Sequence, residues 1–260
     1  MPDFQAMEEN LRATLAVFGR AKAAGETREF PGVTVTSSDV AFPMFNSAVL
    51  TAPVSTAGEL DDRIRTAAQF FEQRGLGWSF WVCQDWIAKV ALSKVEIVFG
   101  RNGLHLVVEL PGMAAEQLAP PLHPLPALTI HRVSDEETRS HFSHIMSIAF
   151  GIPGPIAQAI YNSERTWLSG FKGYVGYVED LPVSSAAVIV TGPVAGVYAV
   201  GTLVAYEHRG FAEAVMRHAI ERVAEQEAID CTVLQSSEAG FSLYKKMGYR
   251  AMTRYAVFAT

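Results

Sequence analysis

The amino-terminal part of the chain changes from a helical to a strand-like pattern of hydrophobic positions. Apolar side chains recur at helical spacing among charged ones, and they predict an amphipathic helix that ends near Gly25. These apolar residues are Phe4, Met7, Leu11, Leu15 and Phe18. Runs rich in Val, Phe and Thr then predict strands over residues 32–37 and 42–51. Because a lone amphipathic helix is marginal in water, this one needs a partner surface.

The pattern next predicts a helix, a strand, a second helix and a further strand. Thr56 and Glu59 have the spacing of a capping box, and the apolar positions after them predict a helix that ends near Gly75. The elements expected after it are a strand over residues 78–83, a helix that Asp85 caps and that continues through Val98, and a strand over residues 104–110.

Five prolines lie within residues 111–126. Proline has no N–H to donate to a helix or a sheet, so this stretch is predicted to be a semi-extended linker. The elements expected beyond it are a strand over residues 128–133, a helix capped by Ser134, a short helix over residues 156–168, and strands over residues 173–178 and 184–191 joined by a turn at residues 179–182.

The strand predicted over residues 197–204 is followed by a turn with Arg209 and Gly210, and then at once by a helix. The buried stripe of that helix comprises Ala212, Val215, Met216, Ala219, Ile220 and Val223. A strand over residues 231–235 and a helix that Ser237 caps and Gly248 ends complete the pattern.

This order of strand, turn and helix predicts an anion site. The first backbone N–H groups of a helix have no partner within it and carry partial positive charge, so they bind a phosphate directly. Gly210 has no side chain, which allows the backbone to come close to such a ligand.

Composition limits the function classes. The chain has 260 residues, a length that suits two domains with ample cores, and its net charge of −6 argues against a nucleic-acid surface. Cys83 and Cys231 lie in apolar runs, so we expect them to be core residues in a reducing compartment. The amino terminus lacks the pattern of a signal peptide, and residues 183–206 read as two strands rather than a membrane span. A globular, cytoplasmic protein is expected.

Two motifs resemble those of the GCN5-related N-acetyltransferase (GNAT) superfamily. That superfamily carries Arg/Gln-x-x-Gly-x-Gly/Ala at a strand-to-helix turn, and this chain has Glu207-His-Arg-Gly-Phe-Ala212. The superfamily's second motif, Ser-x-x-Gly-x-x-Leu-Tyr-x-Lys-x-Gly-Phe/Tyr, resembles Ser237-Glu-Ala-Gly-Phe-Ser-Leu-Tyr-Lys-Lys-Met-Gly-Tyr249. The two motifs have the expected separation, and the elements from about residue 128 to 258 have the order of the superfamily.

The first part of the chain repeats this order of elements, which indicates an internal duplication. We therefore expect an α/β (α+β) fold of two GNAT-like units, each a mixed, mostly antiparallel sheet flanked by helices. The boundaries expected are 1–112 for a degenerate unit, 113–127 for the linker and 128–260 for the catalytic unit. Where the second unit has Arg-Gly-x-Ala, the first has Glu59, Asp61 and Asp62, which would repel a diphosphate.

The resemblance implies acetyl-CoA as cosubstrate and a primary amine as acceptor. Backbone groups of His208, Arg209, Gly210, Phe211, Ala212 and Glu213 would bind the pyrophosphate, while Leu203 and Val204 would offer strand-edge groups to the pantetheine arm. Glu207, Ser237 and Tyr244 complete the expected cofactor site. Glu207 departs from the usual Gln or Arg, and Glu213 adds a second negative charge.

The resemblance also makes Tyr244 the acid that protonates the leaving thiolate. Its alternative role is that of a core residue. The predicted strand over residues 197–204 carries no carboxylate to act as base. The candidates left are Glu179, the carboxylate of Thr260, and a relay of water molecules.

Other chemistry finds little support in the sequence. His141 and His144 are three residues apart, but no further ligand is arranged near them, so no metal site is expected. A non-catalytic acyl-CoA-binding or interaction module stays open as an alternative function. A homodimer is equally open.

Overall fold

The computed structural model describes residues 3–168 and 170–260. Up to residue 115 the elements are α1 (Phe4–Phe18), β1 (Glu26–Phe30), β2 (Val33–Ser37), a 3-10 turn (Pro43–Phe45), β3 (Asn46–Leu50), α2 (Ala57–Glu72), β4 (Ser79–Cys83), a 3-10 turn (Gln84–Trp86), α3 (Lys89–Leu92), α4 (Val95–Arg101) and β5 (His105–Ala115).

From residue 129 onward the elements are β6 (Thr129–Arg132), α5 (Glu136–Phe150), α6 (Gly154–Tyr161), α7 (Glu164–Trp167), β7 (Lys172–Val178), β8 (Leu181–Thr191), β9 (Val194–Thr202), a 3-10 turn (Val204–Tyr206), α8 (Phe211–Ala224), β10 (Cys231–Gln235), α9 (Glu238–Lys246) and β11 (Arg250–Ala259).

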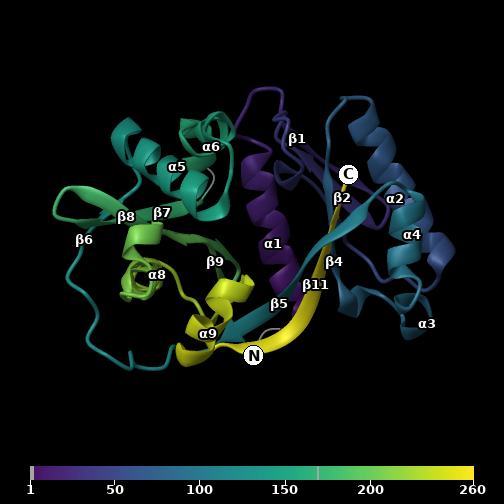
Figure 1. The fold of residues 1–260 in the computed structure, drawn as a ribbon. Coiled ribbons are helices and arrows are strands. Elements are labelled where there is room, and N and C mark those ends of the chain that lie inside the picture. The colour runs from purple at the N-terminus through teal and green to yellow at the C-terminus, as the bar shows by residue number, and fades with distance from the viewer. Residues whose placement is uncertain (1–2, 169) are drawn as a thin grey trace.

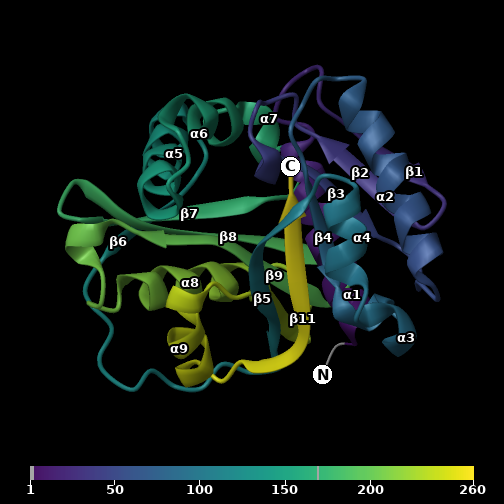
Figure 2. The same ribbon diagram turned by 45° about the vertical axis from the view of Figure 1, so that its right-hand side comes forward.

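All eleven of these strands form one sheet, in the order β1-β2-β3-β4-β11-β5-β10-β9-β8-β7-β6 (Figure 1). The pairs β3–β4 and β9–β10 are parallel, and the other neighbours are antiparallel. Over its β7–β8 part, α5 and α6 cover one face while α8 and α9 lie on the other (Figure 2). The predicted mixed, mostly antiparallel α/β sheet with flanking helices is therefore confirmed.

The centre of the sheet is interleaved. β11, the last strand of the chain, lies between β4 and β5, and β5 lies between β11 and β10 (Figure 1). The six central strands read β3-β4-β11-β5-β10-β9. Exchanging β3 with β9, β4 with β10 and β5 with β11 gives the same order in reverse, so the arrangement is symmetrical about the β11–β5 pair.

Several predicted elements differ in the structure. The N-cap of α5 is Asp135 rather than Ser134, and the helix predicted over residues 156–168 is divided into α6 and α7. α1 ends at Phe18 rather than near Gly25, because the N–H groups of Arg20 and Ala21 donate three residues back, to Val17 and Phe18, instead of four. No helix begins at Asp85, since the following Ile87 forms a strand-like bridge with Val54.

Residues Pro111–Ala115 of the predicted linker belong instead to β5. Pro111 is tolerated in the sheet because its carbonyl accepts from the N–H of Ser236 (2.9 Å), and its missing N–H is not needed for that bond. The sequence pattern also missed β1, an exposed strand whose residues are mostly charged and polar.

α1 lies across the middle of the molecule and contacts both parts of the chain (Figure 1). Met7 and Leu11 pack in a core cluster with Val33 and other residues of the first part, whereas the buried Val17 packs with Phe142 of the second. The partner surface that the amphipathic pattern required is therefore the junction of the two parts.

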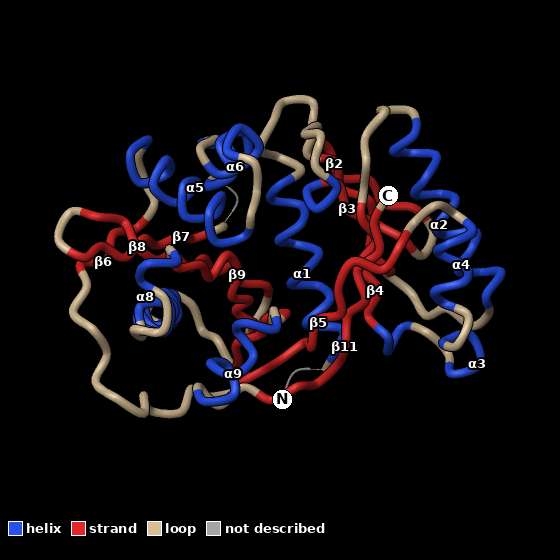
Figure 3. The backbone as a smooth tube through the Cα atoms, in the orientation of Figure 1, coloured by secondary structure: helices blue, strands red, loops and turns tan. Residues whose placement is uncertain are grey.

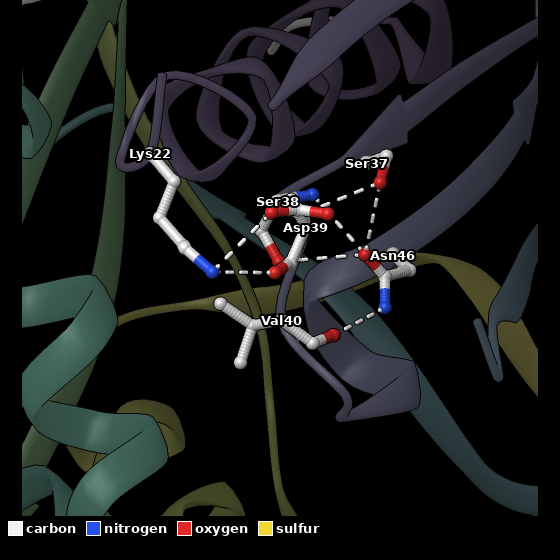
Figure 4. Close-up of polar contacts among 6 residues, drawn as sticks. All are labelled: Lys22, Ser37, Ser38, Asp39, Val40 and Asn46. Atoms are coloured by element: carbon white, nitrogen blue, oxygen red, sulfur yellow. Dashed lines mark hydrogen bonds and ion pairs between the residues drawn. The ribbon is translucent and has the colours of Figure 1, made fainter. Parts of the chain in front are cut away.

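A buried asparagine holds the connection from β2 to β3 (Figure 4). The Nδ2 of Asn46 donates to the carbonyls of Val40 (2.8 Å), Phe42 (3.3 Å) and Gly77 (3.0 Å), and its Oδ1 accepts from the N–H of Ser38 (3.1 Å). These bonds satisfy the carbonyl and amide groups of a loop that lies close to the core.

Candidate functional site

A bulge distorts β9 where its contact with β10 ends. Ser185 pairs with Gly201 and Ala187 pairs with Tyr198, so β9 has one residue more than β8 between these pairs. Ala199, inside the bulge, has a φ of 51°. Such a conformation is rare for a residue with a side chain, and bulges of this kind recur next to active sites.

β9 and β10 then separate. Their parallel pairing joins Cys231 to Val194 and ends at the pair of Val233 and Gly196, yet β9 continues to Thr202 and β10 to Gln235. Over the described residues no backbone pairing joins the two strands beyond that point. The facing strand edges therefore offer N–H and carbonyl groups to an extended ligand.

The β9–α8 turn, residues 203–210, lies at the open end of these strands. Gly210 is the N-cap of α8 with a φ of 82°, and His208 has a φ of 59°. Residues 207–210 are exposed, whereas Phe211, the first residue of α8, is buried, and a Cβ on Gly210 would lie 3.2 Å from the Pro126 ring. Arg209 lies over the rings of Tyr206 and Phe211, at 5.4 and 5.0 Å from their centres. The strand, turn and helix thus follow one another as the sequence predicted.

The acidic residues near this turn differ in their surroundings. Glu213 forms an ion pair with Arg217 (2.7 Å), which offsets its charge near the helix start. Glu207 is exposed, and Ala212 is only partly covered. A phosphate at the start of α8 would therefore meet one unpaired carboxylate rather than two.

The structure limits the predicted roles of Leu203 and Val204. The N–H of Leu203 donates to the carbonyl of Val183 (2.9 Å), and the carbonyl of Leu203 accepts from the N–H of Tyr206 (2.8 Å). The N–H of Leu203 is therefore already used, although the sequence predicted it as a strand-edge group for the pantetheine arm. Val204 begins a 3-10 turn and its side chain is 70 % exposed. The unpaired edge of β9 lies earlier, between Gly196 and Thr202.

Tyr244 lies on α9 within a core cluster that includes Met247 and Tyr249. Burial raises the pKa of Tyr244 to about 12, so the phenol keeps its proton at neutral pH. Its ring lies 5.9 Å from that of Tyr249. Ser237 caps α9 as predicted, by accepting from the N–H of Gly240 (3.2 Å).

The two predicted side-chain and terminal bases lie in different places. Glu179 is in the tight turn between β7 and β8, exposed and with a φ of 53°, as its alternative role as a turn residue predicted. Thr260 exchanges two hydrogen bonds of 3.1 Å with Trp78, and the chain end lies beside the first part of the sheet (Figure 3).

The histidine pair behaves as expected for a surface helix. His141 Nδ1 is 3.0 Å from the hydroxyl of Tyr177, and His144 is exposed. Within residues 3–168 and 170–260, no group of three His, Cys, Asp or Glu side chains is arranged to bind a metal ion.

The corresponding place in the first part of the chain, between β3 and β4, is closed. After the last β3–β4 pair, Val54 and Ile87 form a further parallel bridge, and Val54 bonds to the backbone of Trp86 (2.7 Å) and Ala88 (2.9 Å). The guanidinium of Arg63 donates to the carbonyl of Pro53 (2.7 Å) in the same loop. Beyond the last β3–β4 pair the backbone is therefore bridged, whereas no such bridge joins β9 and β10 beyond Gly196 and Val233 among the described residues.

Sequence reasoning missed one ionisable residue at the centre of the sheet. Glu8 lies on α1 with its side chain buried, and its carboxylate accepts from Trp86 Nε1 (2.8 Å). The signal was present in the helical spacing, because Glu8 lies four residues after Phe4 and three before Leu11 and therefore on the apolar stripe.

None of the described helices is long and apolar enough to cross a bilayer.

Comparison with known proteins gives a family match for the second part of the chain. Residues 174–257, about a third of the chain, match the family model described as FR47-like protein. No protein with a curated description matches the sequence significantly.

Several solved structures share the fold over most of the chain. A GCN5-related N-acetyltransferase from Kribbella flavida is 17% identical, with a TM-score of 0.71 over 96% of this chain and 95% of its own. A functionally unknown conserved protein from Staphylococcus epidermidis is 15% identical, with a TM-score of 0.66 over 92% and 95%. A GCN5-related N-acetyltransferase from Sphaerobacter thermophilus is 15% identical, with a TM-score of 0.60 over 88% and 76%. The chain therefore has the fold of GCN5-related N-acetyltransferases, and the family match together with these structures supports its place in that superfamily.

Proposed function

We propose that this protein is an acyltransferase that moves the acetyl group of acetyl-CoA to a primary amine. The observation that carries the proposal is the separation of β9 from β10 beyond Gly196 and Val233, with the start of α8 following the end of β9. A pantetheine arm carries amide groups that can pair with free strand edges, and a pyrophosphate suits a helix N-terminus. The likeness to GNAT structures and the FR47-like match support this assignment.

In this proposal the main chain of residues 208–213 binds the pyrophosphate, and the edge of β9 up to Thr202 binds the pantetheine arm. Attack of the amine on the thioester releases a thiolate, which Tyr244 protonates. With a pKa near 12 the phenol is protonated at neutral pH and so has a proton to donate, although burial makes it a weaker acid than an exposed tyrosine. A positioned acid contributes to turnover.

We further propose that the two parts of the chain are tandem GNAT-like copies, with a degenerate first copy over residues 1–112, a linker and a catalytic copy over residues 128–260. The symmetrical order of the six central strands supports this origin. So does the parallel pairing at equivalent places, β3 with β4 and β9 with β10. The Val54–Ile87 bridge and the acidic start of α2 explain why only the second copy would take the cofactor.

The test is titration with acetyl-CoA of two matched variants. Ala212 and Gly58 are both the second residue of their helices, α8 and α2. A glutamate is tolerated in a first helical turn but repels a phosphate there. We expect Ala212→Glu to weaken acetyl-CoA binding about tenfold or more, and Gly58→Glu to leave it unchanged.

Calorimetric titration measures both affinities. A wild-type protein that ignores acetyl-CoA, or one that loses binding on Gly58→Glu rather than Ala212→Glu, would contradict the proposed site.

A non-catalytic acyl-CoA-binding module is the second candidate, favoured by the absence of a carboxylate on β9. Thiol release from acetyl-CoA over a panel of primary amines separates the two functions. Binding without turnover would favour the module.

A further inference from the structure

Two serines are buried in β8 opposite the bulge of β9. Ser184 and Ser185 are both 0 % exposed, and the residues beside them in the strand, 183 and 186–189, are buried and apolar. A buried hydroxyl group destabilises a fold unless it is hydrogen-bonded, so two adjacent ones in an apolar strand call for an explanation. Both hydroxyls donate to backbone carbonyls of β9, which relates them to the bulge.

The two hydroxyls bond to carbonyls on either side of Val200. Ser185 Oγ donates to the carbonyl of Ala199 (3.1 Å), and Ser184 Oγ donates to the carbonyl of Gly201 (2.8 Å). The hydroxyl of Thr202 lies 2.9 Å from Ser184 Oγ. Because Ser184 has a single hydroxyl proton and gives it to Gly201, Thr202 is the donor in that pair. Side-chain bonds therefore hold β9 before and after Val200.

Ala199 has the backbone conformation that these bonds have to maintain. Its φ of 51° lies in the left-handed region, which is unfavourable for a residue with a side chain. Such strain persists only where the surrounding structure determines the conformation, and it recurs at functional sites. Ser185 bonds to the carbonyl of this strained residue itself. We therefore expect the shape of the bulge to depend on the Ser185 hydroxyl.

The bonds also show which backbone groups of β9 face β10. The carbonyl of Gly201 accepts from β8, and the N–H of Leu203 donates to Val183 of β8 (2.9 Å), so both residues direct their backbone groups to β8. Successive residues of a strand direct these groups to opposite edges. Val200 and Thr202 therefore direct theirs to the side of β10, beyond the last β9–β10 pair.

This part of β9 is also accessible. Residues 194–197 are buried, whereas residues 198–200 and 202 are partly exposed. The accessible part of the strand thus coincides with the bulge and with the bonds from β8. An extended ligand could reach the backbone of Val200 and Thr202 from the side of β10.

We propose that Ser184 and Ser185 are positioning residues, whose hydroxyls hold the bulge of β9 in the shape in which the backbone groups of Val200 and Thr202 pair with the pantetheine arm of acetyl-CoA. This inference rests on the acetyl transfer proposed above. It deepens that proposal because it names the side chains that shape the strand edge for the cosubstrate. Neither serine touches the reacting atoms, and both act through the main chain of β9.

Ser143 on α5 provides a contrast. It is also 0 % exposed, yet its hydroxyl has no hydrogen-bond partner among the described residues. The interior of this protein therefore tolerates a serine that bonds to nothing. The bonds from Ser184 and Ser185 to β9 are consequently not an unavoidable result of burying a serine.

The test compares acetyl-CoA titrations of Ser185→Ala and Ser143→Ala. Each change removes one buried hydroxyl, but only the first takes the donor from the carbonyl of Ala199. We expect Ser185→Ala to weaken acetyl-CoA binding about tenfold or more, because a strand edge that must be ordered on binding gives lower affinity. Ser184→Ala should weaken binding in the same way. Ser143→Ala should stay within about twofold of wild type, and calorimetry measures all three affinities.

A double variant separates positioning from packing. Glycine adopts the left-handed conformation without strain, so Ala199→Gly removes the need for the Ser185 bond. We expect Ser185→Ala/Ala199→Gly to recover acetyl-CoA affinity to within about threefold of wild type. A role in packing alone predicts no recovery, since glycine does not fill the space that the lost hydroxyl leaves.

Thermal unfolding of each variant shows whether it is folded in the titration. Acetyl-CoA affinity that Ser184→Ala or Ser185→Ala leaves unchanged would overturn the role of that serine, while acetyl transfer stands. So would an equal loss in Ser143→Ala, or a loss in Ser185→Ala, of affinity or of folding, that Ala199→Gly does not recover. Failure of the wild-type protein to bind acetyl-CoA would overturn both proposals.

Discussion

Tyr244 is a motif residue that is also packed in the core. It is 8 % exposed in a core cluster, as its alternative role as a core residue predicted, and its pKa of about 12 keeps the phenol protonated while making it a weaker acid than an exposed tyrosine. Tyr249 is a matched neighbour, because it is a tyrosine buried in the same core cluster.

We expect Tyr244→Phe to lower turnover about tenfold or more, because the departing thiolate loses its proton donor, with acetyl-CoA affinity within about twofold of wild type. Tyr249→Phe should retain turnover. Steady-state thiol release and calorimetric titration measure the two quantities. Equal turnover in wild type and Tyr244→Phe would leave Tyr244 a packing residue.

Single residues also show where sequence reasoning succeeds. Ser237 and Thr56 were predicted as helix caps and both accept the expected backbone N–H, because capping depends on residues three apart in the chain. Asp85 also looked like a cap, but its carboxylate accepts instead from the hydroxyl of Thr253. That partner is far away in the sequence, so no local pattern could have indicated it.

At the scale of elements, α1 approaches the sheet closely because glycines lie beneath it. A Cβ on Gly196 of β9 would lie 1.7 Å from Asn10 Oδ1, and one on Gly112 of β5 would lie 2.7 Å from Met7 Sδ. Asn10 is fully buried and its Nδ2 donates to Thr191 (2.9 Å), so it cannot turn away without leaving polar groups unpaired.

Gly196→Ala should therefore destabilise the protein by about 2–3 kcal/mol, since α1 must shift or Asn10 must lose its bonds. Gly58→Ala is the control, because it lies in the first turn of α2 with no atom closer than 3.9 Å to a new Cβ. That change should be neutral or stabilise by up to about 1 kcal/mol. Urea denaturation gives both values, and equal midpoints for the two variants would contradict the close approach of α1.

At the scale of the whole molecule, the two parts of the chain share their central strands. β11 pairs with β4 through residues 255–259 and with β5 along its length, and β5 in turn pairs with β10. Removing either part would expose the edges of strands that are now central.

The protein should consequently unfold in one cooperative transition, despite its proposed tandem origin. Tryptophan fluorescence reports mainly the first part, which holds Trp78, Trp81 and Trp86, and a fluorophore attached at position 144 through His144→Cys would report the second. Because the native cysteines are buried, the label is selective. Both probes should give the same denaturant midpoint. Separate midpoints would show that the halves fold independently.

The sequence alone determined most of the secondary structure, the two motifs and the helix start at Gly210. These depend on periodicity, capping and turn residues, which act over a few positions of the chain. The tertiary structure alone decided the interleaving of β5 and β11, the closed β3–β4 junction, the open β9–β10 junction and the burial of Glu8. Each of these arises from pairing or packing between residues far apart in the chain, and no local pattern encodes which distant strand or helix becomes the neighbour.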